Sequence, residues 1–236
     1  MKTIDINSTD LALIFWKKIL DNCLSKQKIY QKDFLKQIDT LDALRYQSDY
    51  NTGSISTTTA WLLFSITLFF KPKSIFEIGS FIGKSTFSMA FAADMYSHEH
   101  KCEIFCCDMS NKIPFPKLSK TKITQFHKTS SSEMLKSIDI KKNCDLIHLD
   151  GSLQNEDFEL LKQRLNDQTI FVLDDFEGCE KGVINLITAL DKSLISRKSH
   201  FLIFPIENEI KKQYGLLEKS SSAVLLPIKY LRITSQ

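Results

Sequence analysis

The fold is decided by the stretch Ser74-Ile-Phe-Glu-Ile-Gly-Ser-Phe-Ile-Gly-Lys-Ser-Thr86. Its apolar first half is typical of a buried strand, and the residues after Gly83 begin a helix that we expect over 85–96. Gly79 and Gly83 let the backbone turn sharply and approach a ligand closely. In open α/β sheets, a loop at the carboxyl end of a strand is where nucleotide-like ligands bind. A tight turn without a ligand would leave the same pattern.

The glycine spacing excludes two common cofactor loops. It is not the GxGxxG of dinucleotide-binding proteins, which disfavours a nicotinamide-dependent oxidoreductase. It is also not the phosphate-binding GxxxxGK[ST] loop, because Gly79 to Lys84 is one residue short of that arrangement. Hydrolysis of ATP or GTP is therefore disfavoured.

Strands and helices alternate on both sides of this loop. Apolar runs predict strands at 74–78, 103–107, 122–127, 145–149, 169–173, 201–204 and 214–217. Helical patterns fill the gaps at 85–96, 133–138, 155–165 and 182–192. This alternation predicts an α/β fold, a Rossmann-like, mostly parallel seven-stranded sheet with helices on both faces.

Residues before the first strand are expected to be helical. Helical spacing over 10–44 predicts one or two helices that cap the main domain, and an apolar helix follows from the serine and threonines at 56–59 to Phe70. The polar stretch 47–54 reads as a loop. We therefore divide the chain into an N-terminal helical cap, 1–52, and a main domain, 53–236. The apolar tail at 223–233 receives no role.

Composition indicates a soluble cytoplasmic protein. A hydrophobic fraction of 43% with 25% charged residues suits one folded core, and a net charge of +3 spread along the chain disfavours a nucleic-acid partner. The six cysteines form no CxxC pair, which argues against zinc and for a reduced compartment. No secretory signal or membrane span is expected, because the longest apolar run, 60–70, is too short. A homo-oligomer stays open.

The pattern Glu77-x-Gly79-x-x-x-Gly83 resembles motif I of class I S-adenosylmethionine-dependent methyltransferases. The resemblance implies that the glycine loop passes under the methionine part of S-adenosylmethionine, and that Glu77 orients the loop and the cofactor's ammonium. Asp108 ends the next strand, where a carboxylate can accept both ribose hydroxyls. An aspartate after a strand is also a common turn former.

Further cofactor contacts follow from the same resemblance. Within the loop they are Ser80, Ser85 and Thr86, and after the third strand they are Ser130 or Ser131, near the adenine. Ile55 and Ser56 match a loop that often folds over the cofactor, although an ordinary inter-helix loop explains them equally well. His148 is interpreted as a strand histidine without a catalytic role.

Two strands end in aspartate: Leu149-Asp150-Gly151 and Leu173-Asp174-Asp175. Parallel pairing would gather Asp150, Asp174 and Asp175 at one sheet edge, where they repel unless a cation or a shared proton intervenes. Hard oxygen ligands suit Mg²⁺, Ca²⁺ or Mn²⁺. Such a metal could lower the pKa of an acceptor hydroxyl. Alternatively, Asp174 and Asp175 cap the following helix and Asp150 forms a turn.

These motifs together resemble small-molecule O-methyltransferases of the macrocin O-methyltransferase and cephalosporin-biosynthesis type, from about Gly53 to Glu218. The resemblance implies that the three aspartates bind the metal and that Asp150 accepts the hydroxyl proton. Relatives often carry DGSH-x-Y, whereas this chain has Leu153 and Asn155 at those positions. We therefore expect an S-adenosylmethionine-dependent methyltransferase for a small-molecule hydroxyl. A noncatalytic cofactor-binding or assembly protein, another reaction on the same fold, and methylation of nitrogen stay open.

Overall fold

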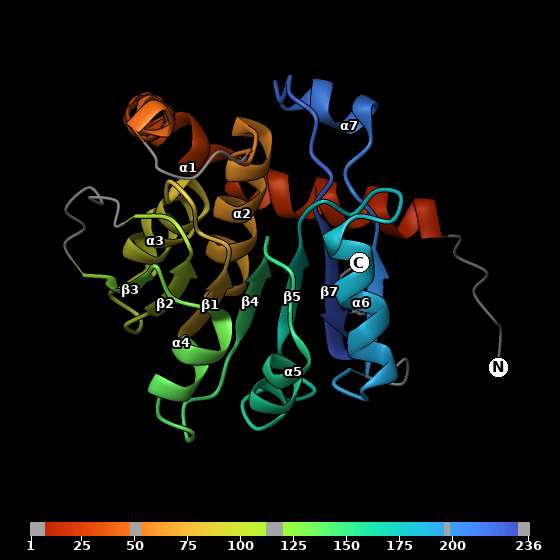
Figure 1. Ribbon diagram of the computed structural model, residues 1–236. Helices are drawn as coiled ribbons and strands as arrows, with labels where there is room; N and C mark the ends of the chain where they lie inside the picture. Colours follow the sequence, from red (N-terminus) through yellow and green to blue (C-terminus); the bar gives the residue numbers. More distant parts are fainter. Residues whose placement is uncertain (1–7, 48–52, 112–119, 196–198, 231–236) are drawn as a thin grey trace, which may run out of the picture.

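A seven-stranded sheet forms the centre of the protein (Figure 1). The computed structural model describes residues 8–47, 53–111, 120–195 and 199–230. The strand order is β3-β2-β1-β4-β5-β7-β6. The strands are β1 Ser74–Ile78, β2 Glu103–Asp108, β3 Lys122–His127, β4 Leu146–Leu149, β5 Ile170–Leu173, β6 His200–Ile203 and β7 Ala223–Pro227. The first five in sequence run parallel, and β7 is antiparallel to both β5 and β6. The predicted fold class is confirmed.

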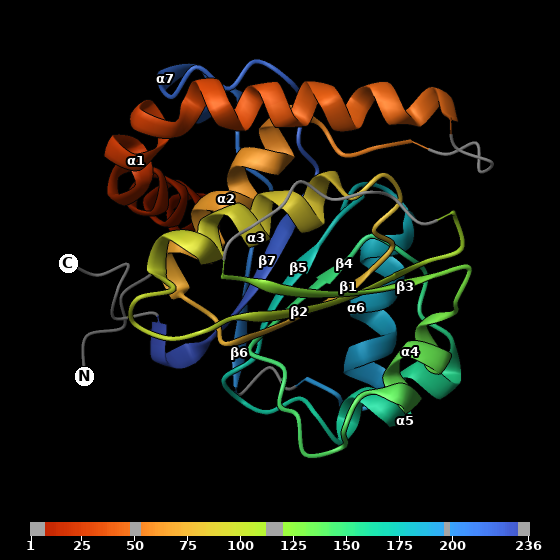
Figure 2. The same cartoon turned by 90° about the vertical axis from the view of Figure 1, so that its left-hand side faces the viewer.

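Helices cover both faces of the sheet (Figure 2). One face carries α1 Ser8–Leu44, α2 Thr57–Phe70 and α3 Lys84–Tyr96, and the other carries α4 Ser131–Ser137, α5 Asn155–Lys162 and α6 Lys181–Asp191. The short α7, Asn208–Gln213, lies beyond the sheet on the α1 side. Local sequence fixes the helix ends: Ser56 caps α2 by accepting a hydrogen bond from Thr59 N at 3.0 Å, and Lys71 closes it in a left-handed conformation before Pro72.

The core lies in two layers, one on each face of the sheet. On the α1–α3 side it is aromatic, with Phe34 of α1 stacked on Trp61 of α2 at a ring separation of 4.0 Å. On the α4–α6 side it is built around buried side chains such as Phe158 and Phe171. Because strand residues alternate between faces, Ile75 packs in the first layer and Phe76 in the second. The strands that carry the site are therefore packed on both faces.

The last predicted strand is wrong. Tyr214–Leu217 contains no strand, because Gly215 turns the chain with φ of +68° and Leu217 is 88% exposed. The seventh strand is β7, in the apolar tail that received no role from the sequence. A 3₁₀ turn, Ile228–Tyr230, follows it, and residues 231–233 of that tail lie outside the described part of the chain.

At the N-terminus, the helical pattern corresponds to a single helix, α1, which ends in a 3₁₀ turn at Arg45–Gln47. The predicted loop begins there, although its residues 48–52, which include the predicted domain boundary, lie outside the described residues. Within the described ranges, no helix is both long and apolar enough to cross a membrane.

Candidate functional site

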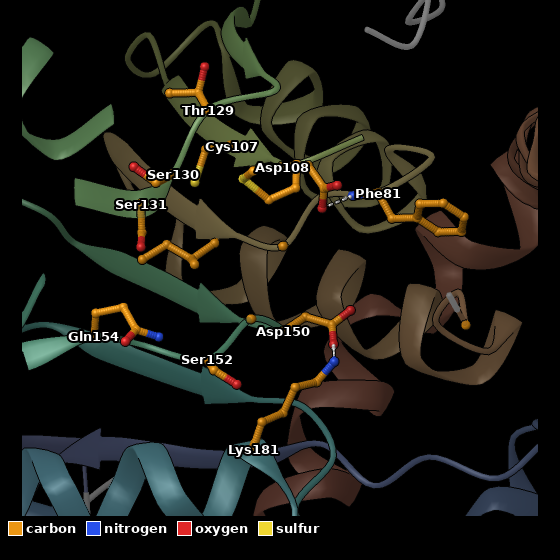
Figure 3. A pocket seen from close by; sticks show the side chains of 15 residues that line it. Phe81, Cys107, Asp108, Thr129, Ser130, Ser131, Asp150, Ser152, Gln154 and Lys181 are labelled. Atoms are coloured by element: carbon orange, nitrogen blue, oxygen red, sulfur yellow. Dashed lines mark hydrogen bonds and ion pairs between the residues drawn. The ribbon is translucent and has the colours of Figure 1, made fainter. Parts of the chain in front are cut away.

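A cavity of about 440 Å³ opens at the carboxyl ends of β1, β2, β3 and β4 (Figure 3). It lies where the parallel strands of an α/β sheet present their loops to a ligand, and its volume suits a small molecule or cofactor. The loop after β1 supplies Gly79 and Phe81, and the loop after β4 supplies Asp150 to Ser152 and Gln154. The remaining lining residues are Gly53, Ile78, Cys107, Asp108, Met109, Thr129, Ser130, Ser131 and Lys181.

The glycine loop passes directly against the end of β4. Gly79 has φ of +92°, and its amide and that of Ser80 donate to Cys107 O at 3.0 and 3.1 Å. A Cβ atom placed on Gly79 would lie 2.7 Å from the carbonyl carbon of Asp150 and 2.8 Å from the amide nitrogen of Gly151. Both the dihedral angle and the close approach therefore require glycine at this position.

Asp108 lines the cavity from the end of β2, as predicted (Figure 3). Its Oδ2 accepts a hydrogen bond from Phe81 N at 2.7 Å, and its Oδ1 accepts one from Ser110 N at 2.8 Å. The carboxylate thus ties the glycine loop to the second strand and holds Phe81 at φ of +40°. Each oxygen can accept a further bond, so Asp108 can also receive hydroxyls from a ligand.

Glu77 lies behind the cavity rather than in it. Its side chain is fully buried, with Oε1 3.1 Å from His148 Nδ1 and Oε2 accepting from the Thr86 hydroxyl. Glu77 therefore joins β1 to β4 and to the start of α3. The contact with Thr86 connects the two elements that flank the glycine loop, and an effect of Glu77 on the loop stays a prediction. A contact with a cofactor's ammonium is not supported, because the buried carboxylate is bonded within the core.

His148, which the sequence indicated to be a strand histidine without a catalytic role, is the buried partner of Glu77. Burial opposes its charge, but the hydrogen bond and the negative charge of Glu77 outweigh burial and raise the pKa of His148, with smaller contributions from Asp150 and Asp174. When His148 is protonated, the two side chains form a buried ion pair. Its position on neighbouring strands, in register, makes it a support for the loop above.

The other predicted cofactor residues fall into two groups, those buried in the protein and those that line the cavity. Ser80, Gly83, Ser85 and Thr86 are buried in the loop or the first turn of α3 and do not line the cavity. Ser130 and Ser131 do line it, but their hydroxyls are engaged in the protein.

The hydroxyl of Ser130 caps α4 through Glu133. That of Ser131 donates to Asp157 at 2.7 Å. These two serines therefore reach the cavity mainly through their backbone and the remaining lone pairs of their oxygens.

A second, smaller cavity of about 210 Å³ adjoins the first. The two share Gly53, Asp150 and Lys181 as lining residues. The second cavity is lined further by Ser54, Ile55, Ser56, Thr59, Asp174, Asp175, Lys219 and Ser221, most of which carry hydroxyl or charged groups. Ile55 and Ser56 thus line this second cavity and not the larger one, and their contact with the cofactor stays a prediction.

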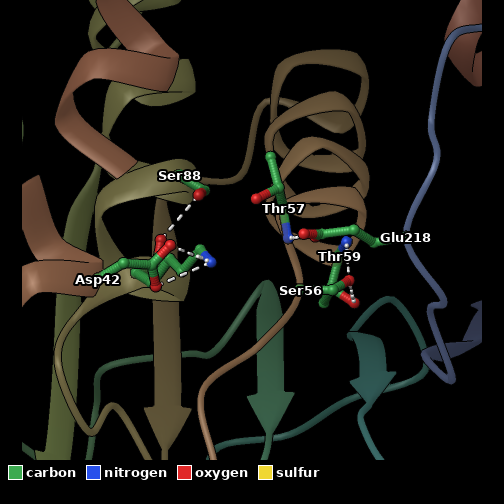
Figure 4. A network of polar contacts seen from close by, with 7 residues as sticks. Asp42, Ser56, Thr57, Thr59, Ser88 and Glu218 are labelled. Carbon is green, nitrogen blue, oxygen red and sulfur yellow. Dashed lines mark hydrogen bonds and ion pairs between the residues drawn. The ribbon is translucent and has the colours of Figure 1, made fainter. Parts of the chain in front are cut away.

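A third cavity shares Ser54, Ile55 and Ser56 with the second, and it is also lined by Asp42, Lys84 and Glu218 (Figure 4). Lys84, which stands near the position of a phosphate-binding lysine, is instead paired with Asp42 of α1 at 2.9 Å. Glu218 accepts from the amide of Thr57 at the start of α2. These contacts fix α1 and the chain before β7 beside the opening, and they leave Lys84 committed to a structural partner.

The three aspartates line the smaller cavity together, but each is engaged by another side chain. Lys181 of α6 lies between two of them, with Nζ 2.6 Å from Asp150 Oδ1 and 3.0 Å from Asp175 Oδ2. The third, Asp174, is buried and accepts from the Ser222 hydroxyl at 2.6 Å. Within the described ranges, no three histidine, cysteine, aspartate or glutamate side chains are placed to hold a metal ion. The predicted metal site of Asp150, Asp174 and Asp175 therefore does not fit this geometry.

Gly182 explains why Lys181 reaches the aspartates. A Cβ atom at Gly182 would lie 2.2 Å from the carbonyl oxygen of Asp174. Its absence lets α6 start directly against the end of β5, which places the preceding lysine beside the two carboxylates.

Charge in this corner is balanced within the protein. Burial, followed by repulsion from Asp174, raises the pKa of Asp150 to about 7, although His148 and Lys181 oppose the shift. Burial disfavours the charge of Lys181, but Asp150 and then Asp175 outweigh it and raise the pKa of Lys181, so it remains an ammonium. Asp150 can thus exchange a proton near neutral pH beside a permanent cation.

Comparison with known proteins finds the same fold in methyltransferases. Residues 76–176 match the family model described as a methyltransferase domain. A comparison with curated proteins finds no match. Among solved structures, the O-methyltransferase TomG of Streptomyces achromogenes, involved in tomaymycin synthesis and in complex with S-adenosylmethionine, is 14% identical with a TM-score of 0.52, covering 81% of this chain and 89% of that one.

A second similar structure is the O-methyltransferase from Bacillus cereus in complex with S-adenosylhomocysteine. It is 11% identical, with a TM-score of 0.53, and the match covers 81% of this chain and 90% of that chain. At such identities the likeness concerns the fold alone. The chain therefore has the fold of S-adenosylmethionine-dependent O-methyltransferases, and the narrower resemblance to the macrocin type stays a prediction.

Proposed function

We propose that this protein transfers the methyl group of S-adenosylmethionine to an oxygen atom of a small, hydroxylated acceptor. The observation that carries the proposal is the junction of two cavities at Asp150 and Lys181. The larger one has the glycine loop and Asp108 expected for the cofactor. The smaller one has polar walls suited to an acceptor with several hydrogen-bonding groups.

The residues of the larger cavity support a definite orientation of the cofactor. Asp108 supplies the carboxylate for the ribose hydroxyls, and Met109 and Phe81 beside it offer apolar surface to the adenine. The methionine part would then lie over Gly79, with its methyl group toward Asp150 and the second cavity. Holding both reactants at this junction supplies most of the rate enhancement, because the sulfonium is already activated.

The chemical step is a direct displacement. The acceptor oxygen loses its proton to the Asp150 carboxylate and forms a bond to the methyl carbon. The carbon–sulfur bond breaks, and its electron pair stays on sulfur, giving neutral S-adenosylhomocysteine. A carboxylate whose pKa is raised to about 7 suits this role near neutral pH.

A divalent metal was part of the expectation from sequence, and it does not enter this step. Its expected ligands are engaged by Lys181 and Ser222, so the donor set does not fit a metal ion.

Calorimetric titration with S-adenosylmethionine and S-adenosylhomocysteine tests the proposal. We expect one site per chain for each, because the glycine loop and Asp108 line one cavity. Adenosine alone should bind more weakly, since it lacks the methionine part that lies over the glycine loop. If neither cofactor gives a binding isotherm, the proposal is wrong.

Asp108 gives a residue-level prediction. Asp108→Ala should weaken binding of S-adenosylhomocysteine by about 10- to 100-fold, because charge-assisted hydrogen bonds of this kind contribute about 1.5–3 kcal/mol. Adenosine and 2′-deoxyadenosine provide the sharper readout. The wild-type protein should discriminate between them, and the variant should not. Equal discrimination in both proteins would mean that Asp108 supports the loop without contacting the ribose.

A further inference from the structure

The side chain of Lys181 occupies the position for which the sequence predicted a cation. Its Nζ atom lies within hydrogen-bond distance of both Asp150 and Asp175, at 2.6 and 3.0 Å. Two carboxylates at the carboxyl edge of a sheet repel each other unless positive charge lies between them. An ammonium group provides that charge without any ion from solution.

Several features build this arrangement into the fold. Gly182 lets α6 begin against the carbonyl of Asp174, and any side chain there would push Lys181 away. Lys181 is placed in the first turn of α6, where the helix dipole disfavours a cation, so its carboxylate partners must offset that cost. Asp174, the third expected ligand, accepts a hydrogen bond from the Ser222 hydroxyl at 2.6 Å.

Lys181 also faces both ligands of the proposed reaction. It lines the larger and the smaller cavity, as does Asp150, so its ammonium lies where the acceptor oxygen must meet the methyl group (Figure 3). A lysine ammonium has three donor hydrogens, and the two aspartates account for two of them. The third can donate to an acceptor oxygen.

We propose that Lys181 is the resident cation of this site, that it takes the place of a divalent metal between Asp150 and Asp175, and that methyl transfer here needs no metal. The inference rests on the proposed function, and it adds a role for Lys181. In the step given above, the ammonium stabilises negative charge that develops on the acceptor oxygen and keeps its own protons, while Asp150 takes the hydroxyl proton.

Manganese binding tests this inference without an identified acceptor. Free Mn²⁺ is followed by electron paramagnetic resonance while the wild-type protein is titrated, with and without S-adenosylhomocysteine. We expect no saturable site. Binding of one Mn²⁺ per wild-type chain that Asp150→Asn removes would overturn the inference.

Variants of Lys181 provide the second arm. Lys181→Met removes the charge and leaves the carboxylates without a cation. It should bind one Mn²⁺ per chain, at least about tenfold more tightly than the detection limit that bounds the wild type. The gain should disappear when Asp150→Asn is added. Lys181→Arg keeps the charge and should behave like the wild type. Lys219→Met is the matched control, because Lys219 lines the same cavity but pairs with Glu177.

The outcomes separate this inference from the proposed function. If Lys181→Met gains no Mn²⁺ affinity, Lys181 is not the cation of the site and the inference fails. Because the side chain of Lys181 is 29% exposed, this variant should fold, and the wild-type titration decides the point even if it does not. S-adenosylhomocysteine binding is measured on the same samples. If the wild-type protein binds both S-adenosylhomocysteine and Mn²⁺, only the inference fails. If the wild-type protein does not bind S-adenosylhomocysteine, the proposed function is contradicted.

Discussion

Gly79→Ala is expected to abolish measurable binding of S-adenosylhomocysteine while leaving the protein folded. The added methyl group would lie 2.7 Å from the backbone of Asp150, and backbone cannot rotate aside as a side chain can. The glycine loop or the end of β4 must move, and both line the proposed cofactor cavity. Overpacking of this kind costs about 1–3 kcal/mol of stability, with about 1 kcal/mol more from the positive φ.

Gly215→Ala is the matched control for this substitution. Gly215 also has a positive φ, +68°, but a Cβ atom there would have no neighbour within 4 Å, and the residue lines neither cavity. It should lose about 1–2 kcal/mol of stability from strain and keep full cofactor affinity. Calorimetry and denaturant unfolding of both variants separate the two effects. If Gly79→Ala binds S-adenosylhomocysteine like the wild type, the cofactor does not lie over this loop.

The central parallel strands β1, β4 and β5 could be predicted because they are buried on both faces and are mostly apolar. Ile170–Leu173 is a clear example. The two ends of the sheet were harder. Six-residue α7 is too short to show a helical period, and the apolar residues around Gly215 imitate a strand. The true seventh strand, β7, pairs antiparallel and follows a serine-rich segment, so no alternation with a helix marked it.

The site could be predicted as far as strand ends determine it. Asp108 and Asp150 lie at the cavity because residues that follow parallel strands share one edge of the sheet. The direction in which a strand side chain points could not be predicted in the same way. Whether Glu77 faces a ligand or the core depends on its partner His148, which is 71 positions away in sequence. No local sequence pattern shows that Glu77 and His148 are in contact.

Lys181 is the residue that sequence reasoning missed. A lysine at the start of a helix is usually solvated, and only its unfavourable place in the first turn hinted at a carboxylate partner. Three aspartates at strand ends require a nearby positive charge, and a bound metal ion was the cation predicted from the sequence. The fold supplies it from a helix that begins six residues after Asp175, which the spacing alone does not reveal.

Replacement of His148 by leucine should produce the largest loss of stability. It would leave the Glu77 carboxylate buried with only the Thr86 hydroxyl as a partner. Removing one member of a buried ion pair costs about 3–5 kcal/mol, whereas replacing both members by apolar residues is often nearly neutral. We therefore expect the double variant Glu77→Leu/His148→Leu to recover most of the loss in denaturant unfolding. A single variant as stable as the wild type would contradict the ion pair.

The same pair predicts a dependence on pH with a definite sign. The pKa of His148 in the folded protein is raised above its ordinary value of 6.5, so the stability contributed by its charged form is complete below that value. It is lost as pH rises through the raised pKa. The free energy of unfolding of the wild type, relative to the double variant, should therefore fall as the solution becomes alkaline. Because Asp150 and Asp174 also act on His148, Asp174→Asn should move this fall to lower pH. A relative stability that rises with pH would mean that His148 is buried as the neutral imidazole and that Glu77 depends on Thr86 alone.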